Sequence, residues 1–279
     1  MINTVNFICG RYQLDLSHAH VMGIVNVTPD SFSDGGRYAS TGLAVAHARQ
    51  LVAEGASILD IGGESTRPNA IPVSLDEELS RVIPVIEQLA SEVDVPISID
   101  TYKPTVMREA VNAGAAIIND IRGLQEPGAL EAAAAGNAGI CLMHMQGSPQ
   151  TMQIEPYYDD VAQEVKNFLL ERLQAVQEAG IVPERIVLDP GFGFGKRTVH
   201  NIALLQALPE ILTLGRPLLV GLSRKSILGQ IVGSDVDQRL HASLAASVIS
   251  AMKGASIIRV HDVKATVDAL KVVNAVLAA

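Results

Sequence analysis

The chain has 279 residues, of which 48% are hydrophobic and 18% are charged, and its formal net charge at pH 7 is −9. This composition suits a large buried core. The negative charge argues against a general nucleic-acid binder, because the phosphate backbone requires a basic surface. The two cysteines, Cys9 and Cys141, are too few for a disulfide framework.

Neither a secretion signal nor a membrane span is expected from the hydrophobic pattern. Residues 1–16 lack the basic start and the long apolar stretch of a signal peptide. Apolar runs elsewhere stay short of the roughly 20 residues that a transmembrane helix needs. With so few cysteines, a reducing compartment is the simplest one, and we expect a cytoplasmic protein that binds no membrane.

The N-terminal segments Val5–Ile8 and Tyr12–Leu16 flank Cys9-Gly10-Arg11, which is the pattern of a β-hairpin. Eight apolar runs of strand length follow, over Met22–Val27, Ser57–Ile61, Pro96–Thr101, Ala116–Ile121, Ile140–Met145, Arg185–Asp189, Pro217–Leu222 and Ser256–Val260. Each run precedes a segment with helical spacing, capping or stop signals. These segments are Gly42–Glu54, Leu75–Ala90, Pro104–Asn112, Pro127–Ala135, Asp160–Ala179, His200–Leu214, Asp235–Lys253 and Val263–Ala278.

Eight strand–helix units without a strong internal boundary predict an α/β protein with a single domain over residues 1–279. The expected architecture is a (β/α)8 TIM barrel, with the short hairpin capping its bottom. A doubly wound open sheet is the alternative, but it usually has fewer units and a Gly-rich turn directly after its first strand. The first turn here contains Pro29, Asp30, Ser31 and Phe32, so the barrel is favoured.

Polar side chains mark the ends of the predicted strands. They are Asn26, Asp60, Asp100, Asn119, Asp120, His144, Asp189, Lys225, Arg259 and His261. In a barrel these positions converge on one mouth. Because a buried polar group costs free energy unless it has a partner, so many of them are better explained by a polar ligand than by internal pairing.

Two chemistries are expected at this mouth. Arg67, Lys225, Arg259 and His261 would suit a phosphate or diphosphate. Asp60, Asp100, Asn119 and Asp189 would suit a nitrogen-rich heterocycle with several N–H groups. The site would then bind a polar ring at its base and an anion nearer its rim.

Other signals are weaker. The segment Gly191–Lys196 looks like a phosphate loop, but it matches neither the Walker spacing nor the dinucleotide-binding pattern. His144 taken alone is better explained as a hydrogen-bonded barrel residue than as a ligand. The first loop, Ser31–Gly36, is too polar and too rich in glycine to cover a core, so it is either a ligand loop or an ordinary βα turn.

Several longer motifs, taken together and in order, resemble the dihydropteroate synthase family over nearly the whole chain. NVTPDSFSDGG at Asn26–Gly36 and DIGGESTRP at Asp60–Pro68 are similar to its two signature stretches. SIDTYKP, NDIRG, LMHMQG, LDPGFGFGK, GLSRKS and RVHDV follow in the family's order. Asn69 stands where the family pattern leads us to expect glycine.

The resemblance implies condensation of 6-hydroxymethyl-7,8-dihydropterin diphosphate with 4-aminobenzoate to 7,8-dihydropteroate and diphosphate. It implies catalytic roles for Asp34, Arg67, Asp100 and Lys225, and a Mg2+ ion bound at Asn26. The implied substrate-binding residues are Phe32, Asp60, Thr66, Pro68, Asn119, Ile121, Met143, Asp189, Phe194, Gly221, Ser226, Arg259 and His261. It also implies a homodimer, for which the Ala and Ser residues of Asp235–Lys253 would allow close packing, and competition by sulfonamides.

The residue chemistry fits a dissociative substitution, in which diphosphate leaves first and the neutral arylamine then attacks. The absence of a recognisable Ser–His or Cys–His nucleophile pair agrees with this. Two other readings stay open: a methyltetrahydrofolate-dependent methyltransferase, which would not need the diphosphate-binding cations, and a non-catalytic protein that binds pterin only.

Overall fold

The computed structural model describes residues 6–28, 36–66 and 70–278. The hairpin consists of β1 (Asn6–Cys9) and β2 (Tyr12–Asp15). The eight strands that follow are β3 (His20–Asn26), β4 (Ile58–Gly62), β5 (Ile97–Asp100), β6 (Ile117–Asp120), β7 (Gly139–Met143), β8 (Ile186–Asp189), β9 (Leu219–Val220) and β10 (Ile257–Val260). The helices are α1 (Gly36–Ala53), α2 (Leu75–Glu92), α3 (Pro104–Asn112), α4 (Ala129–Ala134), α5 (Val161–Glu178), α6 (Thr198–Gln206), α7 (Leu208–Leu212), α8 (Ser226–Val232), α9 (Leu240–Met252) and α10 (Val263–Leu277).

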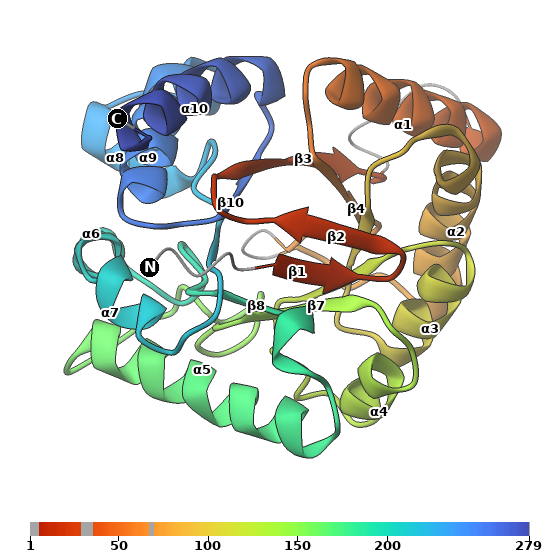
Figure 1. The fold of residues 1–279 in the computed structure, drawn as a ribbon, viewed down its shortest axis with the longest axis horizontal. Coiled ribbons are helices and arrows are strands. Elements are labelled where there is room, and N and C mark those ends of the chain that lie inside the picture. The colour runs from red at the N-terminus through yellow and green to blue at the C-terminus, as the bar shows by residue number, and fades with distance from the viewer. Residues whose placement is uncertain (1–5, 29–35, 67–69, 279) are drawn as a thin grey trace.

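The eight strands form one parallel sheet in the order β8-β7-β6-β5-β4-β3-β10-β9. A parallel bridge between Leu188 and Leu218 joins its two ends, where Leu188 N donates to Pro217 O (2.9 Å). The sheet therefore curls into a nearly closed barrel, and Figure 1 shows the helices arranged around it. The predicted (β/α)8 barrel with an N-terminal hairpin is confirmed.

The hairpin covers the end of the barrel at which the strands begin, as predicted. Phe7 and Cys9 are fully buried in a cluster with residues from the early part of the strands, among them Met22, Ile58 and Ile117. In Figure 1 the hairpin crosses the middle of the ring of helices. An apolar plug at this end leaves the opposite end, where the strands finish, as the mouth for a ligand.

Some helix boundaries differ from the predictions. The first helix begins at Gly36 rather than at Gly42. The helix predicted over 200–214 is split into α6 and α7, and Pro209, which lacks an N–H, lies at the start of α7. Helix α8 was not predicted, because Ser226–Val232 is short and begins at the last residue of the polar SRKS segment. Short elements leave little periodicity to read.

Most of the Ala and Ser residues of α9 face the chain's own interior. Ser243, Ala246, Ser247 and Ser250 are buried, and Ser247 and Ser250 donate to the carbonyls four residues earlier. These buried side chains therefore pack within the chain, and the contact between subunits expected along Asp235–Lys253 stays a prediction. The exposed large hydrophobic residues of α9 are Ile249 and Met252.

The plug generates a prediction at Gly139, the first residue of β7. A Cβ atom there would lie 2.4 Å from Phe7 Cζ and 2.8 Å from Cys9 Cβ, both closer than real contacts allow. We expect Gly139→Ala to lower the free energy of unfolding by about 1–3 kcal/mol, since an overpacked core must shift. Urea denaturation measures this.

Gly136→Ala is the matched control. Its Cβ would meet only Val111 Cγ1, at 3.8 Å, which is ordinary contact distance. Equal free energies of unfolding for the two variants would contradict the packing described for the plug.

Candidate active site

Three neighbouring strands bring polar residues to two adjacent levels of the mouth. The register pairs Gly62 of β4 with Asp100 of β5, and Asp100 with Asn119 of β6. Asp60 lies two residues before Gly62, so it points to the same side of β4, one layer deeper. On the next pair of strands, Met143 of β7 lies beside Asp189 of β8. The parallel register alone thus gathers the side chains that the sequence predicts to converge.

Arg259 of β10 closes this arrangement from the other side of the barrel. Its Nε donates to Asp60 Oδ2 (2.6 Å) and its Nη2 donates to Asp100 Oδ2 (2.7 Å). Asn119 Nδ2 lies 3.3 Å from Asp60 Oδ2, so the same carboxylate accepts from two strands. Arg259, which the sequence assigned to the anion, therefore lies directly beside two of the acids.

The burial of these groups changes their acidity. Burial raises the pKa of Asp100 to about 7; the Arg259 guanidinium opposes this rise, and the Asp60 carboxylate adds to it. Burial also raises the pKa of Asp189, against the attraction of Lys225. The pKa of Arg259 is raised, because Asp60 and Asp100 together outweigh its burial. The site therefore holds more carboxyl groups than cations, and one of those carboxyl groups titrates near neutral pH.

A pocket opens directly above the ion pairs. Its lining consists of Asp100, Asn119, Ile121, Met143, Asp189, Phe194, Gly221, Lys225 and Arg259. Every one of these residues belongs to the set predicted from the sequence. Two apolar side chains and one aromatic ring face acceptors, donors and cations, which is the composition of a site for a flat polar ring.

Lys225 stands at the edge of this pocket, at the N-cap of α8. Its Nζ lies 4.4 Å from the centroid of the Phe194 ring and donates to the carbonyl of Phe192. Burial lowers the pKa of Lys225 to about 8, against the opposing effect of Asp189. A buried amine that contacts a ring face and a carbonyl is held in a single position beside the ligand space.

Two of the polar residues at strand ends serve other purposes. The carboxylate of Asp120 accepts from Arg122 N and Leu124 N, both at 2.8 Å, and so shapes the turn after β6. Because side chains alternate along a strand, the inward position of Asn119 turns Asp120 outward. His144 Nδ1 lies 2.8 Å from Lys196 Nζ, and its ring packs edge-on against Phe168. His144 is thus a hydrogen-bonded barrel residue, as predicted.

The remaining predicted residues lie outside this pocket lining. Asn26 ends β3, Thr66 is half-buried after β4, and Ser226 begins α8. His261 follows β10, and its Nδ1 lies 3.1 Å from Ser223 Oγ, a partner that was not predicted although it belongs to the SRKS segment. The other predictions fall on Phe32, Asp34, Arg67 and Pro68, which, like Asn69, lie outside the described residues.

Two further features bear on the choice of site. Within 6–28, 36–66 and 70–278, no group of three or more His, Cys, Asp or Glu side chains could hold a metal ion, and none of the helices is long and apolar enough to cross a membrane.

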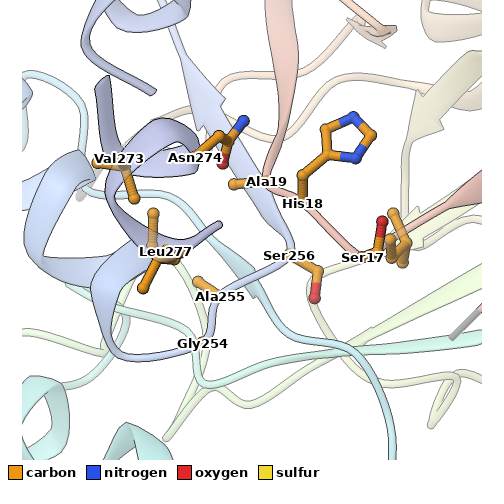
Figure 2. A pocket seen from close by; sticks show the side chains of 11 residues that line it. Ser17, His18, Ala19, Gly254, Ala255, Ser256, Val273, Asn274 and Leu277 are labelled. Carbon is orange, nitrogen blue, oxygen red and sulfur yellow. The ribbon is translucent and has the colours of Figure 1, made fainter. Parts of the chain in front are cut away.

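A second hollow, shown in Figure 2, lies where β3 and β10 begin. Its polar side chains, Ser17, His18, Ser256 and Asn274, are not among the predicted site residues. Active sites of such barrels lie at the other end.

Comparison with known proteins points to one family. The pterin binding enzyme family matches residues 22–261. The dihydropteroate synthase of Escherichia coli K12 is 58% identical over 266 residues, which cover 95% of this chain and 94% of that protein.

Solved structures agree with this family. A Yersinia pestis dihydropteroate synthase in a sulfonamide drug complex superposes with a TM-score of 0.94, at 52% identity over 98% of this chain and 100% of that one. A Xanthomonas albilineans dihydropteroate synthase with 7,8-dihydropteroate superposes with a TM-score of 0.89, at 47% identity over 99% of both chains.

The acidity of Asp100 generates a prediction about stability. Its pKa is about 7 in the folded chain and 3.8 as an ordinary carboxyl, so the folded state binds this proton more tightly than the unfolded state. Relative to Asp100→Asn, the wild type should therefore lose stability as the pH rises from 4 to 7, by up to about 1.4 kcal/mol per pH unit. Above pH 7 this difference should stay constant. Urea denaturation across this range measures the difference.

The non-titrating variant Met143→Leu, in the same pocket lining, is the control, and its difference from the wild type should not change with pH. A difference between wild type and Asp100→Asn that stays constant from pH 4 to 7 would contradict the assignment.

Proposed function

The chain belongs to the dihydropteroate synthase family, and from that premise we propose that it condenses 6-hydroxymethyl-7,8-dihydropterin diphosphate with 4-aminobenzoate. The products are 7,8-dihydropteroate and diphosphate. The single observation that carries this proposal is the pocket at the strand ends, whose nine lining residues all belong to the predicted substrate-binding and catalytic set. Its mixture of acceptors, cations and apolar side chains suits a pterin ring.

The pterin is proposed to lie flat between Ile121 and Met143. Its ring and amino N–H groups would donate to Asp100 and Asp189, and Asn119 would both donate and accept. These side chains come from strands whose register is fixed by the sheet, so they require little reorganisation on binding. Lys225 and Arg259 offset the carboxylate charge and keep the acids oriented.

The reaction is proposed to proceed by loss of diphosphate before attack. The bond between the exocyclic methylene carbon and oxygen breaks with both electrons leaving on the diphosphate, and the electron-rich pterin stabilises the resulting cation. The buried carboxylates of Asp100 and Asp189 favour that positive charge. The neutral arylamine nitrogen then forms the new carbon–nitrogen bond and loses one proton to diphosphate or water. The diphosphate would be bound by Thr66, Arg67, Arg259 and His261. The aminobenzoate pocket would be lined by Phe32, Pro68 and Ser226, and the first loop would contribute Asp34 to the site.

A Mg2+ ion is proposed to assist at Asn26. The amide oxygen of this residue suits a hard cation, but alone it is too weak to hold one. The described residues provide no cluster of His, Cys, Asp or Glu for a metal, so the residues fit the ion only together with oxygens of the substrate diphosphate. When bound, Mg2+ would neutralise the leaving group.

A homodimer in the cytoplasm is also proposed. Large apolar side chains are exposed along neighbouring helices, with Ile249 and Met252 on α9 and Val272 and Val276 on α10. Such a group of side chains favours contact with a second copy of the chain.

Both cysteines are free and buried, in keeping with a reducing compartment. Since the Yersinia pestis relative forms a sulfonamide complex, we expect sulfonamides to compete with 4-aminobenzoate here.

Turnover by the purified protein with both substrates tests the proposal. We expect 7,8-dihydropteroate to form, and diphosphate to be released slowly even without 4-aminobenzoate, because carbon–oxygen cleavage comes first. A methyltransferase would instead turn over methyltetrahydrofolate, and a non-catalytic protein would only bind the pterin. Diphosphate release that strictly required 4-aminobenzoate would contradict the dissociative order while leaving the overall reaction intact.

Removal of the metal forms a separate prediction. We expect chelation by EDTA to reduce turnover at least tenfold, because bound Mg2+ stabilises the charge that develops on the leaving group. Added Mg2+ should restore it. By calorimetry the free protein should not bind Mg2+ measurably, whereas the protein with diphosphate should. Full activity in EDTA would contradict the metal's role.

A further inference from the structure

Lys196 is a buried amine that the proposed reaction does not use. The residue is 3% exposed, and it precedes Arg197, the N-cap of α6. The amine donates to the carbonyls of Gly191 (2.8 Å) and Phe194 (3.1 Å), and it lies 2.8 Å from His144 Nδ1. Burial lowers the pKa of His144 to about 2, an effect that Lys196 adds to, so the imidazole is neutral. Burying an amine among neutral acceptors costs free energy. This cost suggests that Lys196 has a role beyond packing.

The segment that Lys196 binds is the GFGFG loop after β8. Gly191, Gly193 and Gly195 have φ values of 69°, 81° and 62°, which non-glycine residues rarely adopt. A Cβ atom at Gly191 would lie 1.8 Å from the carbonyl oxygen of His144, and one at Gly195 would lie 2.5 Å from that of Gln146. The loop therefore packs directly against the backbone that follows β7.

The carbonyls of this loop are satisfied by side chains of the protein. Besides the two that Lys196 binds, the carbonyl of Phe192 accepts from Lys225, that of Gly193 from Gln153 Nε2 (2.7 Å), and that of Gly195 from the Tyr158 hydroxyl (2.9 Å). Lys225 belongs to the pocket lining, whereas Lys196, Gln153 and Tyr158 hold the backbone from outside that lining. The loop thus resembles a phosphate-binding loop in composition, but its carbonyls accept hydrogen bonds from side chains of the chain itself.

Phe194 links this scaffold to the pocket. Its carbonyl accepts from Lys196, while its ring lines the pocket and lies 4.4 Å from Lys225 Nζ. Lys196 acts on the backbone of the residue whose side chain covers Lys225. The two lysines therefore bind opposite ends of one residue, and only one of them faces the ligand space.

We infer that Lys196 is a positioning residue for the pterin pocket, which acts through Phe194. Its amine fixes the Phe194 backbone so that the ring stays against Lys225 and completes the pocket wall. This inference rests on the proposed function for its effect on pterin binding, but the placement of the ring can be tested without any substrate.

The substrate-free test uses 19F NMR of protein labelled with 4-fluorophenylalanine. The chain has five Phe residues, and Phe194→Leu identifies the Phe194 signal. In Lys196→Met we expect that signal to shift or broaden, while the signal of Phe7, in the plug at the other end of the barrel, stays. Lys253→Met is the matched control, because Lys253 donates to a single carbonyl, that of Gln206, from the end of α9. An unmoved Phe194 signal in Lys196→Met would overturn the inference, and Lys196→Gln replaces Lys196→Met if the latter does not fold.

The binding test is a double-mutant cycle with the pterin substrate. In protein that keeps Phe194, Lys196→Met should raise the dissociation constant of the pterin substrate about tenfold or more, because a small displacement of the pocket wall weakens binding. In the Phe194→Leu variant, Lys196→Met should hardly change this dissociation constant, because the ring through which Lys196 acts is absent. Equal losses in both backgrounds would overturn the inference. A wild type that binds no pterin would refute the proposed function instead, and the NMR result would still stand.

Discussion

The structure depends on one partly buried guanidinium that holds two carboxylates across the barrel. Arg259 bonds to Asp60 and Asp100, which are 199 and 159 residues away in the sequence. The bonds join β10 to β4 and β5, on the two sides of β3. Removing one member of such a group leaves an uncompensated buried charge, which is strongly destabilising. The same contacts orient the acids that face the ligand space, so stability and binding rest on the same atoms.

The charge in this site is unbalanced, and the imbalance has a chemical meaning. Asp60, Asp100 and Asp189 face Arg259 and Lys225, and the pKa values of Asp100 and Asp189 are raised as a result of burial. Ligand N–H donors would relieve part of this cost by supplying the hydrogen bonds that water gives elsewhere. A cation forming next to these acids would relieve more. The free protein is thus organised for a ligand that is rich in donors and becomes positive during the reaction.

The two ends of the barrel divide stability from chemistry. At the end where the strands begin, the hairpin places Phe7 and Cys9 against apolar side chains and against Gly139, where no Cβ fits. At the other end the loops carry polar groups, and the GFGFG loop is held by bonds from buried side chains rather than by regular structure. A rigid base allows the upper loops to be irregular without loss of the fold.

The order of the elements and the convergence of the site were determined by the sequence alone. Apolar runs of strand length, each ending in a polar residue, indicated the barrel and placed Asp100, Asn119 and Asp189 at its mouth, because parallel strands put their ends at one edge. The tertiary structure decided how these groups are partnered. Arg259 lies among the acids, Asp120 turns outward, and Lys196 binds the backbone of Phe194. Four small residues of α9, Ser243, Ala246, Ser247 and Ser250, pack inward within the chain. Such outcomes depend on distances between segments far apart in the chain, and local periodicity carries no information about them.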